Sequence, residues 1–142
     1  MNNIKLKFKK LTKTAQLPRY AHDGDSGMDI CADEDFEVCT SSATISTGIA
    51  AVIPDGYELQ VRPRSGMSKR GVFAAFGTVD SGYRGEIKVT LINASMLGYD
   101  VHKGDRIAQL VLAPVTRADI EETYDLGEET ERGANGFGST GV

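Results

Sequence analysis

Two short loops combine residue types that could act on a phosphate ester. In the turn formed by residues 77–85, Asp80 could hold and polarise a water molecule, and Tyr83 could lie flat against a sugar. Residues 62–68 begin at the end of a predicted strand. There, the guanidinium group of Arg64 could donate two hydrogen bonds to phosphate oxygens, with the hydroxyl of Ser65 beside it. A hairpin turn with a packed tyrosine, and a capped turn with a surface arginine, explain the same residues structurally, so both interpretations stay open.

Three more polar side chains stand at positions where chemistry is possible. Asp25 and Asp29 lie near the start of a predicted strand, and either carboxylate could support hydrated Mg²⁺, which commonly uses one or two carboxylates and keeps several waters. A solvated acidic loop explains them without a metal. Gln109 interrupts an apolar run, and a buried amide needs hydrogen-bond partners. Gln109 therefore serves either a structural network or a site.

The composition changes sharply from Thr130 onward. Four glycines accompany one arginine, one phenylalanine and a Ser-Thr pair in residues 132–142. Such a tail has two interpretations: a frayed terminus, or a lid whose glycines allow close backbone approach and present N–H donors to phosphate. It is not a Walker A loop, because no lysine follows the glycines. We expect one domain, with a core at residues 1–129 and a flexible glycine-rich tail at residues 130–142, for which composition alone favours the frayed terminus.

Length and composition exclude several classes of protein. The 142 residues suit one domain, and 40% hydrophobic with 25% charged residues is ordinary for a globular protein. The net charge of −4 argues against general nucleic-acid binding. No apolar run is long enough for a transmembrane helix, and no h-region follows the basic first residues. We therefore expect no membrane contact and a cytoplasmic protein, or a nuclear or organellar one in a eukaryote.

Cysteine and histidine usage gives no metal-ligand pattern. Cys31, Cys39, His22 and His102 have no zinc-ligand spacing. The spacing of the cysteines leaves a disulfide open, but we favour two buried free thiols in predicted strands.

The elements that must position these residues are mostly strands. Apolar and polar residues alternate at Ile4–Lys9, Tyr57–Arg62 and Ile87–Leu91, and continuous apolar runs at Ile45–Ile53 and Ile107–Val115 are typical of strands buried on both faces. Turn residues separate the runs, and one short helical turn is expected around Met67–Arg70. Many short strands at regular spacing predict an all-β, jelly-roll-like β-barrel or a sandwich.

In chain order, five segments resemble the five motifs of the trimeric dUTPase family. They are Asp25–Ala32, Pro63–Ser68, Gly77–Ile87, Gly104–Leu110 and Arg132–Gly141. One such segment alone would be a weak signal, but five in the family's order and spacing are specific. The resemblance covers essentially the whole chain.

The resemblance implies a jelly-roll-like fold and a homotrimer with composite active sites. It implies that Asp80 activates or positions the attacking water and that Gln109 contacts the α-phosphate region. Asp29 would organise the water shell of Mg²⁺, and Tyr83 would pack under the deoxyribose and exclude a 2′-hydroxyl. The other residues that it places against the substrate are Arg64, Ser65, Gly66, Ala74, Gly77, Val79, Lys88, Arg132, Phe137, Gly138, Ser139 and Thr140.

Different parts of the substrate would meet different motifs. Residues 64–66 would bind phosphate, while the glycine-rich tail would form a lid with Phe137 stacked on uracil. The hydroxyls of Ser139 and Thr140 would reach the γ-phosphate. In such trimers the third motif comes from a neighbouring subunit, and the tail closes from another.

The implied reaction is hydrolysis of dUTP to dUMP and pyrophosphate, which would keep uracil out of DNA and supply dUMP for dTMP synthesis. A water held by Asp80 would attack the α-phosphorus in line. A triphosphate carries about four negative charges, which Mg²⁺, Arg64 and Arg132 would neutralise. The expected partners are dUTP and further copies of the same chain.

One segment departs from the family pattern. The hairpin at Lys69–Phe76 looks shorter than the usual uracil-binding hairpin, and Ala74 or Ala75 stands where many members carry an asparagine that helps read the base. Backbone N–H and C=O groups of this hairpin could read uracil instead.

Two other functions compete with this one. A dCTP deaminase shares the fold but uses a glutamate on the strand after the aspartate turn, and residues 89–93 contain none. A non-catalytic binding module should have lost Asp80, Tyr83 or the tail, and this chain keeps all three. Both alternatives are disfavoured, and a second role beside catalysis stays open.

Overall fold

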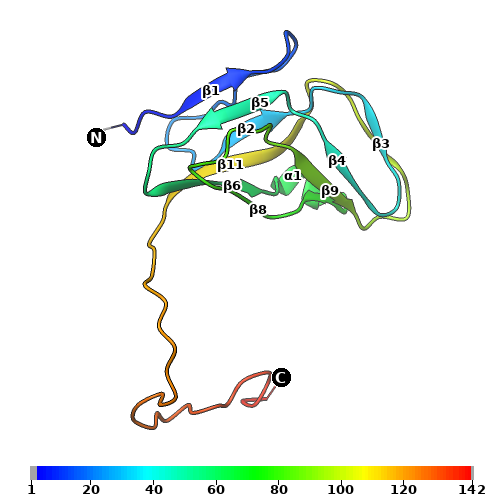
Figure 1. Cartoon of the computed structure of the whole chain (residues 1–142). Coiled ribbons are helices and arrows are strands. Elements are labelled where there is room, and N and C mark those ends of the chain that lie inside the picture. The colour runs from blue at the N-terminus through cyan, green and yellow to red at the C-terminus, as the bar shows by residue number, and fades with distance from the viewer. Residues whose placement is uncertain (1–2, 142) are drawn as a thin grey trace.

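Eleven strands and one single-turn helix make up the regular structure of residues 3–141, the part of the chain that this computed structural model describes (Figure 1). The elements in chain order are β1 (Lys7–Lys10), β2 (Met28–Cys31), β3 (Phe36–Val38), β4 (Ser42–Ile45), β5 (Ile49–Val52), β6 (Tyr57–Arg62), α1 (Ser65–Ser68), β7 (Val72–Ala74), β8 (Gly77–Val79), β9 (Val89–Asn93), β10 (Tyr99–Val101) and β11 (Arg106–Pro114). The predicted all-β architecture is confirmed.

The strands form four antiparallel sheets. The largest has the order β2-β11-β6-β8, and a second has the order β4-β9-β7. The pairs β1-β5 and β10-β3 make up the other two. Within the described residues these ladders do not join into one closed barrel, so the predicted barrel is open between its sheets. Most neighbours in these orders are distant in sequence, as expected for the crossing connections of a jelly roll.

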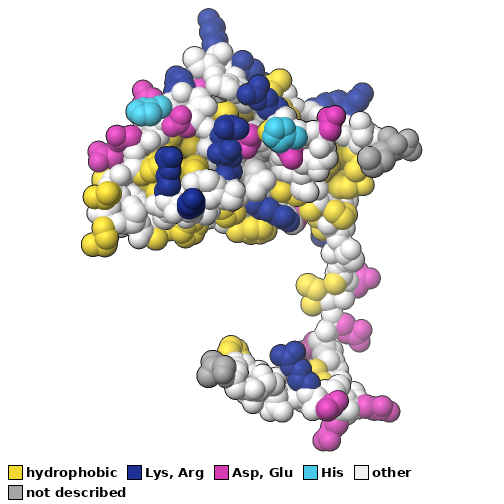
Figure 2. Space-filling view, turned by 180° about the vertical axis from the view of Figure 1, so that it is seen from behind, with side chains coloured by type: hydrophobic (Ala, Val, Ile, Leu, Met, Phe, Trp, Pro, Cys, Tyr) yellow, Lys and Arg dark blue, Asp and Glu magenta, His cyan; other side chains and the backbone are white. Residues whose placement is uncertain are grey.

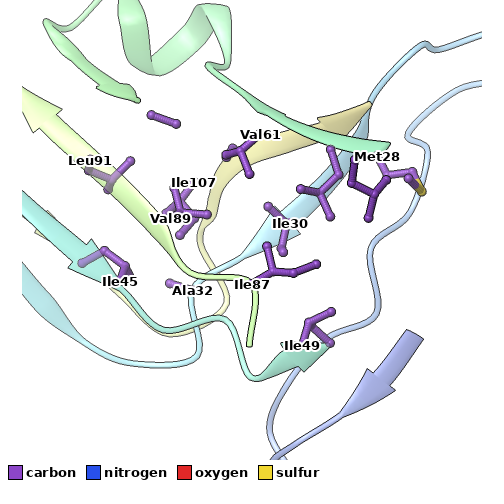
Figure 3. Packing of buried hydrophobic residues seen from close by; sticks show 14 of the residues in the cluster. Met28, Ile30, Ala32, Ile45, Ile49, Val61, Ile87, Val89, Leu91 and Ile107 are labelled. Carbon is purple, nitrogen blue, oxygen red and sulfur yellow. The ribbon is translucent and has the colours of Figure 1, made fainter. Parts of the chain in front are cut away.

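Aliphatic side chains from several sheets fill the interior (Figure 3). Ile30 from β2, Leu91 from β9 and Leu110 from β11 are fully buried. Ile87 and Ile107 lie in the same cluster. Burying side chains of this size stabilises a fold by about 1.5–3 kcal/mol each. The core therefore fixes the positions of the strands whose ends carry the polar residues.

The predicted apolar strand at Ile45–Ile53 is wrong in one respect, because the chain breaks there into β4 and β5. Thr47 is fully buried, and its hydroxyl donates a hydrogen bond to the carbonyl of Ile87. Gly48 has a φ of 66°, a left-handed conformation that interrupts a strand. A buried polar turn of this kind is hidden inside an apolar run of sequence.

Both cysteines are free, but the expectation that both are buried is wrong. Cys39 is exposed and Cys31 is half-buried. In β2 the buried residues are Met28 and Ile30, so the alternation of the strand turns Cys31 to the outer face. Val38 is buried at the end of β3, which leaves the next residue pointing outward.

After β11 ends at Pro114, residues 115–141 contain no strand or helix and extend away from the sheets (Figure 1). Ile120, Tyr124 and Leu126 in this stretch are almost completely exposed. Acidic side chains also gather along it (Figure 2). Residues 1–2 and 142, at the ends of the expected core and lid, lie outside the described part of the chain. Across residues 3–141, no helix has the length and apolar character needed to cross a membrane.

Candidate active site

Asp29 lies at the centre of a charged cluster on β2, the end strand of the four-stranded sheet. Its Oδ1 is 2.9 Å from Nε of Arg64, and its Oδ2 is 3.4 Å from Nη1 of Arg106. Arg64 also donates a hydrogen bond from Nη1 to the carbonyl of Arg106, at 3.2 Å. Two guanidinium groups therefore face one carboxylate, and their remaining N–H donors can reach an anion.

A β-bulge in β11 turns Arg106 and Gln109 to the same face of the sheet. Arg106 lies opposite Cys31 and Gln109 opposite Asp29, with a register shift between Arg106 and Ala108. In a regular strand, residues three positions apart point to opposite faces. The extra residue of the bulge cancels that alternation. Arg106 and Gln109 therefore both lie on the face of Asp29.

A cavity of about 330 Å³ opens beside this cluster. Its walls include Asp29, Arg64 and Gln109, together with Ser65 and Gly66 from the start of α1. The structure thus brings together five of the residues predicted to hold Mg²⁺ or phosphate. The helix itself begins at Ser65, two residues before the predicted turn around Met67–Arg70.

Gln109 is held in place on two sides. Its Nε2 donates a hydrogen bond to the carbonyl of Pro63 at 2.8 Å. On the other side it packs over Gly27, where an added Cβ would lie 2.9 Å from its Cδ. An amide nitrogen carries two hydrogens, and among residues 3–141 only the Pro63 carbonyl accepts from it, so the second hydrogen can reach a ligand.

Asp80 and Tyr83 line a second cavity, of about 740 Å³, with Val79 and Lys88. The loop is a tight turn in which the backbone N–H of Tyr83 donates to the carbonyl of Asp80 at 3.0 Å. The hydroxyl of Tyr83 donates to the carbonyl of Glu86 at 2.9 Å. The hairpin interpretation and the site interpretation are therefore compatible, since the turn itself presents the carboxylate.

The tail forms a third hollow, of about 780 Å³, from its own residues. Arg132, Phe137, Gly138, Ser139 and Thr140, all of which were expected in the lid, line it. The side chain of Phe137 is fully exposed and its φ is 52°, a left-handed value that is uncommon outside glycine. The tail thus displays an aromatic ring and two hydroxyl groups to solvent.

The three cavities stay separate within one chain, and two expected residues face elsewhere. The side chain of Ala74 is 1% exposed and packs in the core, so its backbone alone could meet a ligand. Gly77 starts β8 opposite Val61, and a Cβ added at Gly77 would meet the side chain of Val61. The residues that sequence analysis grouped into one site are therefore distributed over three regions of the protomer.

Arg106 is the residue of the cluster that sequence analysis did not assign. It stands within the fourth motif, but its pairing with Asp29 depends on the bulge, which alternation does not predict. His22 and Asp25 also line the first cavity. Asp25 was considered in the sequence analysis as a support for Mg²⁺, whereas His22 was not assigned to the site.

The thiol of the half-buried Cys31 has a raised pKa. Burial raises the pKa of its thiol, and the nearby charge of Asp29 raises it further. The neutral thiol is a poor nucleophile. Within residues 3–141, no group of three or more His, Cys, Asp or Glu side chains is arranged to hold a metal ion.

The fold is all-β, and the cluster presents two guanidinium groups whose donors can bind an anion. The family model described as dUTPase matches residues 13–141. The chain belongs to the dUTPase family.

Individual members of this family resemble the chain along nearly all of its length. It is 48% identical to the deoxyuridine 5'-triphosphate nucleotidohydrolase of Gloeothece citriformis, with 98% of each chain covered. It is 51% identical to the enzyme of the same name from Desulfotalea psychrophila, over 92% of this chain and 91% of that one. The structure of Staphylococcus bacteriophage 80alpha dUTPase with dUpNHpp has a TM-score of 0.91 and 29% identity, covering 99% of this chain and all of the other.

Proposed function

We propose that the protein hydrolyses dUTP to dUMP and pyrophosphate. The observation that carries this proposal is the cavity in which Arg64 and Arg106 flank Asp29, beside the first residues of α1. Such a site suits the phosphate chain of a nucleotide in an acidic protein. Membership of the dUTPase family and the names of the relatives support the choice of nucleotide.

Asp80 is proposed as the group that activates water. Its carboxylate takes a proton from the water as the oxygen attacks the α-phosphorus, and the bond from that phosphorus to the bridging oxygen breaks to release pyrophosphate. Lys88, on the same cavity, can offset the negative charge there. The free N–H of Gln109 can donate to an oxygen of the α-phosphate, where charge builds up during attack.

Mg²⁺ is proposed to arrive with the nucleotide. Asp29 is a single carboxylate already paired with two arginines, so it cannot bind the ion strongly alone. Its carboxylate could accept hydrogen bonds from one or two waters of a magnesium ion that is bound mainly by the substrate phosphates. The ion would neutralise charge on the triphosphate, and Arg64 with the tail's Arg132 would add to that effect.

A homotrimer with composite active sites is proposed because the expected site residues lie in separate cavities of one chain. The arginine cluster, the Asp80 loop and the tail line three different cavities. Contributions from three copies around a threefold axis would let these pieces meet. Tyr83 would then lie under the deoxyribose, and the ring of Phe137 on the uracil. The tail at residues 130–142 is accordingly proposed as the lid of a single domain whose core spans residues 1–129.

The biological role follows from the reaction. Removing dUTP would keep uracil out of DNA, and dUMP would feed dTMP synthesis. We propose that the protein acts in the compartment where nucleotides are made. In the bacterial relatives, that compartment is the cytoplasm.

Pyrophosphate release from dUTP, dCTP, dTTP and UTP, with and without Mg²⁺, tests the proposal. We expect release from dUTP with magnesium and little from the other nucleotides. Absence of dUMP and pyrophosphate from the dUTP reaction would refute the proposed function. Ammonia release from dCTP would favour a deaminase instead.

A further inference from the structure

The Tyr83 ring occupies the space beside Gly85. A Cβ built on Gly85 would lie 2.6 Å from Cζ of Tyr83 and 3.0 Å from its Cε2. Carbon atoms in favourable contact are about 3.5–4.0 Å apart. Any side chain at position 85 would therefore push this ring aside by about 1 Å or more.

The backbone supplies no second reason for a glycine at this position. Gly85 is absent from the described glycines with positive φ, so an alanine could adopt its conformation. The three nearest atoms to the added Cβ all belong to Tyr83. That side chain is 48% exposed, so its ring can swing into solvent without opening the core. Gly85 thus determines the position of the ring, while the fold does not depend on it.

The other side of the ring is anchored by Glu86. The hydroxyl of Tyr83 donates to the carbonyl of Glu86 at 2.9 Å. The carboxylate of Glu86 in turn accepts from the backbone N–H of Gly48 at 2.8 Å and from the hydroxyl of Ser46. The ring is therefore tied, through one residue, to the connection between β4 and β5. Its orientation results from free space at Gly85 and a fixed acceptor at Glu86.

We propose that Gly85 is a positioning residue for sugar selectivity. Because Gly85 has no side chain, the Tyr83 ring can lie across position 85 and line the cavity that also contains Asp80. This inference rests on the proposed function, in which that ring packs under the deoxyribose and leaves no room for a 2′-hydroxyl. A displacement of about 1 Å is enough to change such a fit.

Steady-state kcat/KM for dUTP and UTP tests the proposal with Gly85→Ala and a matched control. In Gly85→Ala we expect the preference for dUTP over UTP to fall about tenfold, the size of a single lost fit in a specific pocket. The melting temperature should stay the same. Gly82→Ala in the same loop is the control, because a Cβ there meets no described atom within 4 Å and its φ is not positive.

A double variant shows whether Gly85 acts through the ring. Tyr83→Ala removes the side chain that the new methyl group would touch, so Tyr83→Ala/Gly85→Ala should have the selectivity of Tyr83→Ala alone. Additive losses, or unchanged selectivity in Gly85→Ala, would overturn the proposal. The double variant should also fold normally even if the single one does not.

A spectroscopic readout separates this inference from the proposed function. In protein with ¹³C-labelled tyrosine and no nucleotide, the ring resonances of Tyr83 should shift in Gly85→Ala and stay unchanged in Gly82→Ala. An unshifted ring would refute the positioning role whatever the enzyme hydrolyses. If wild-type protein hydrolysed neither nucleotide, the proposed function would fail, and a shifted ring would still show that Gly85 positions Tyr83.

Discussion

The cluster around Asp29 and the tail after β11 both carry residues expected to meet the triphosphate, but they are held in different ways. Asp29 and Gln109 lie opposite each other in a strand ladder, and ion pairs fix the arginines. Residues 116–141 pair with no strand, and local turns supply their backbone hydrogen bonds. The cluster is thus arranged before substrate binds, whereas the tail requires contacts from outside its own segment to become ordered over a ligand.

The largest effect on turnover should come from a substitution in the loop that carries Asp80, which follows β8. Asp80→Asn keeps the size of the side chain but removes the base, so turnover on dUTP should fall by about 10²–10⁴-fold. The melting temperature should not change, because Asp80 is exposed and lies outside the core. Turnover close to that of the wild-type protein would remove Asp80 from the mechanism and leave the sheet region without its catalytic group.

Deleting residues 132–142 tests the tail side of the comparison. Turnover should fall about a hundredfold or more, because several donors to the phosphate chain are lost together. The melting temperature should stay within about a degree, since the deletion removes no core residue. A large drop in the melting temperature would mean that the tail stabilises the fold and does not serve as a lid.

The strands were predictable where one face is buried and the pattern is regular. The bounds predicted for β6, Tyr57–Arg62, match the structure. The strand predicted at Ile87–Leu91 begins two residues later, as β9, because the backbone N–H of Ile87 donates to Ile49 instead. Alternation reports which side chains are buried, and it is insensitive to where the ladder begins.

The site was predictable in its residue types and only partly in its geometry. The resemblance grouped Arg64 with Asp29, and the structure pairs them. The bulge that adds Arg106, and the packing of Gly85 against Tyr83, depend on register and on atoms close in space. No periodicity or composition encodes those features.

A pair of matched substitutions measures how much each region contributes to stability. Ile107→Ala should lower the free energy of unfolding by about 2–5 kcal/mol, because its side chain is fully buried in the core. Ile120→Ala in the exposed tail should change it by less than about 0.5 kcal/mol. Denaturant unfolding of both variants checks this difference. Equal losses would show that the tail packs as tightly as the sheets.

The smallest effect should be a change in the stability of the fold at acidic pH, which depends on Asp33. Burial acts to raise the pKa of Asp33, but hydrogen bonds from Thr12 and Thr14 and nearby lysines bring it below its usual value. A lowered pKa gives stability that is present above the unfolded value of about 3.9 and is lost as the pH falls through the folded value.

Acid unfolding of a matched pair checks that pH dependence. Thr14→Val should reduce the extra loss of stability below about pH 4, because it removes one of the two hydroxyl donors to Asp33. Thr123→Val removes a hydroxyl that bonds within the tail and should leave the acid transition unchanged. Identical behaviour of the two variants would remove Asp33 from the explanation.

Mixing two inactive variants tests most directly whether the sheet loop and the tail of different chains build one site. Asp80→Asn retains the tail, and the protein lacking residues 132–142 retains Asp80. After the subunits are dissociated and reassembled together, we expect about a quarter of wild-type dUTP turnover, because a random symmetric assembly pairs the two intact parts that often. If no activity returns although mixed trimers form, both parts come from the same chain, and the composite site is wrong.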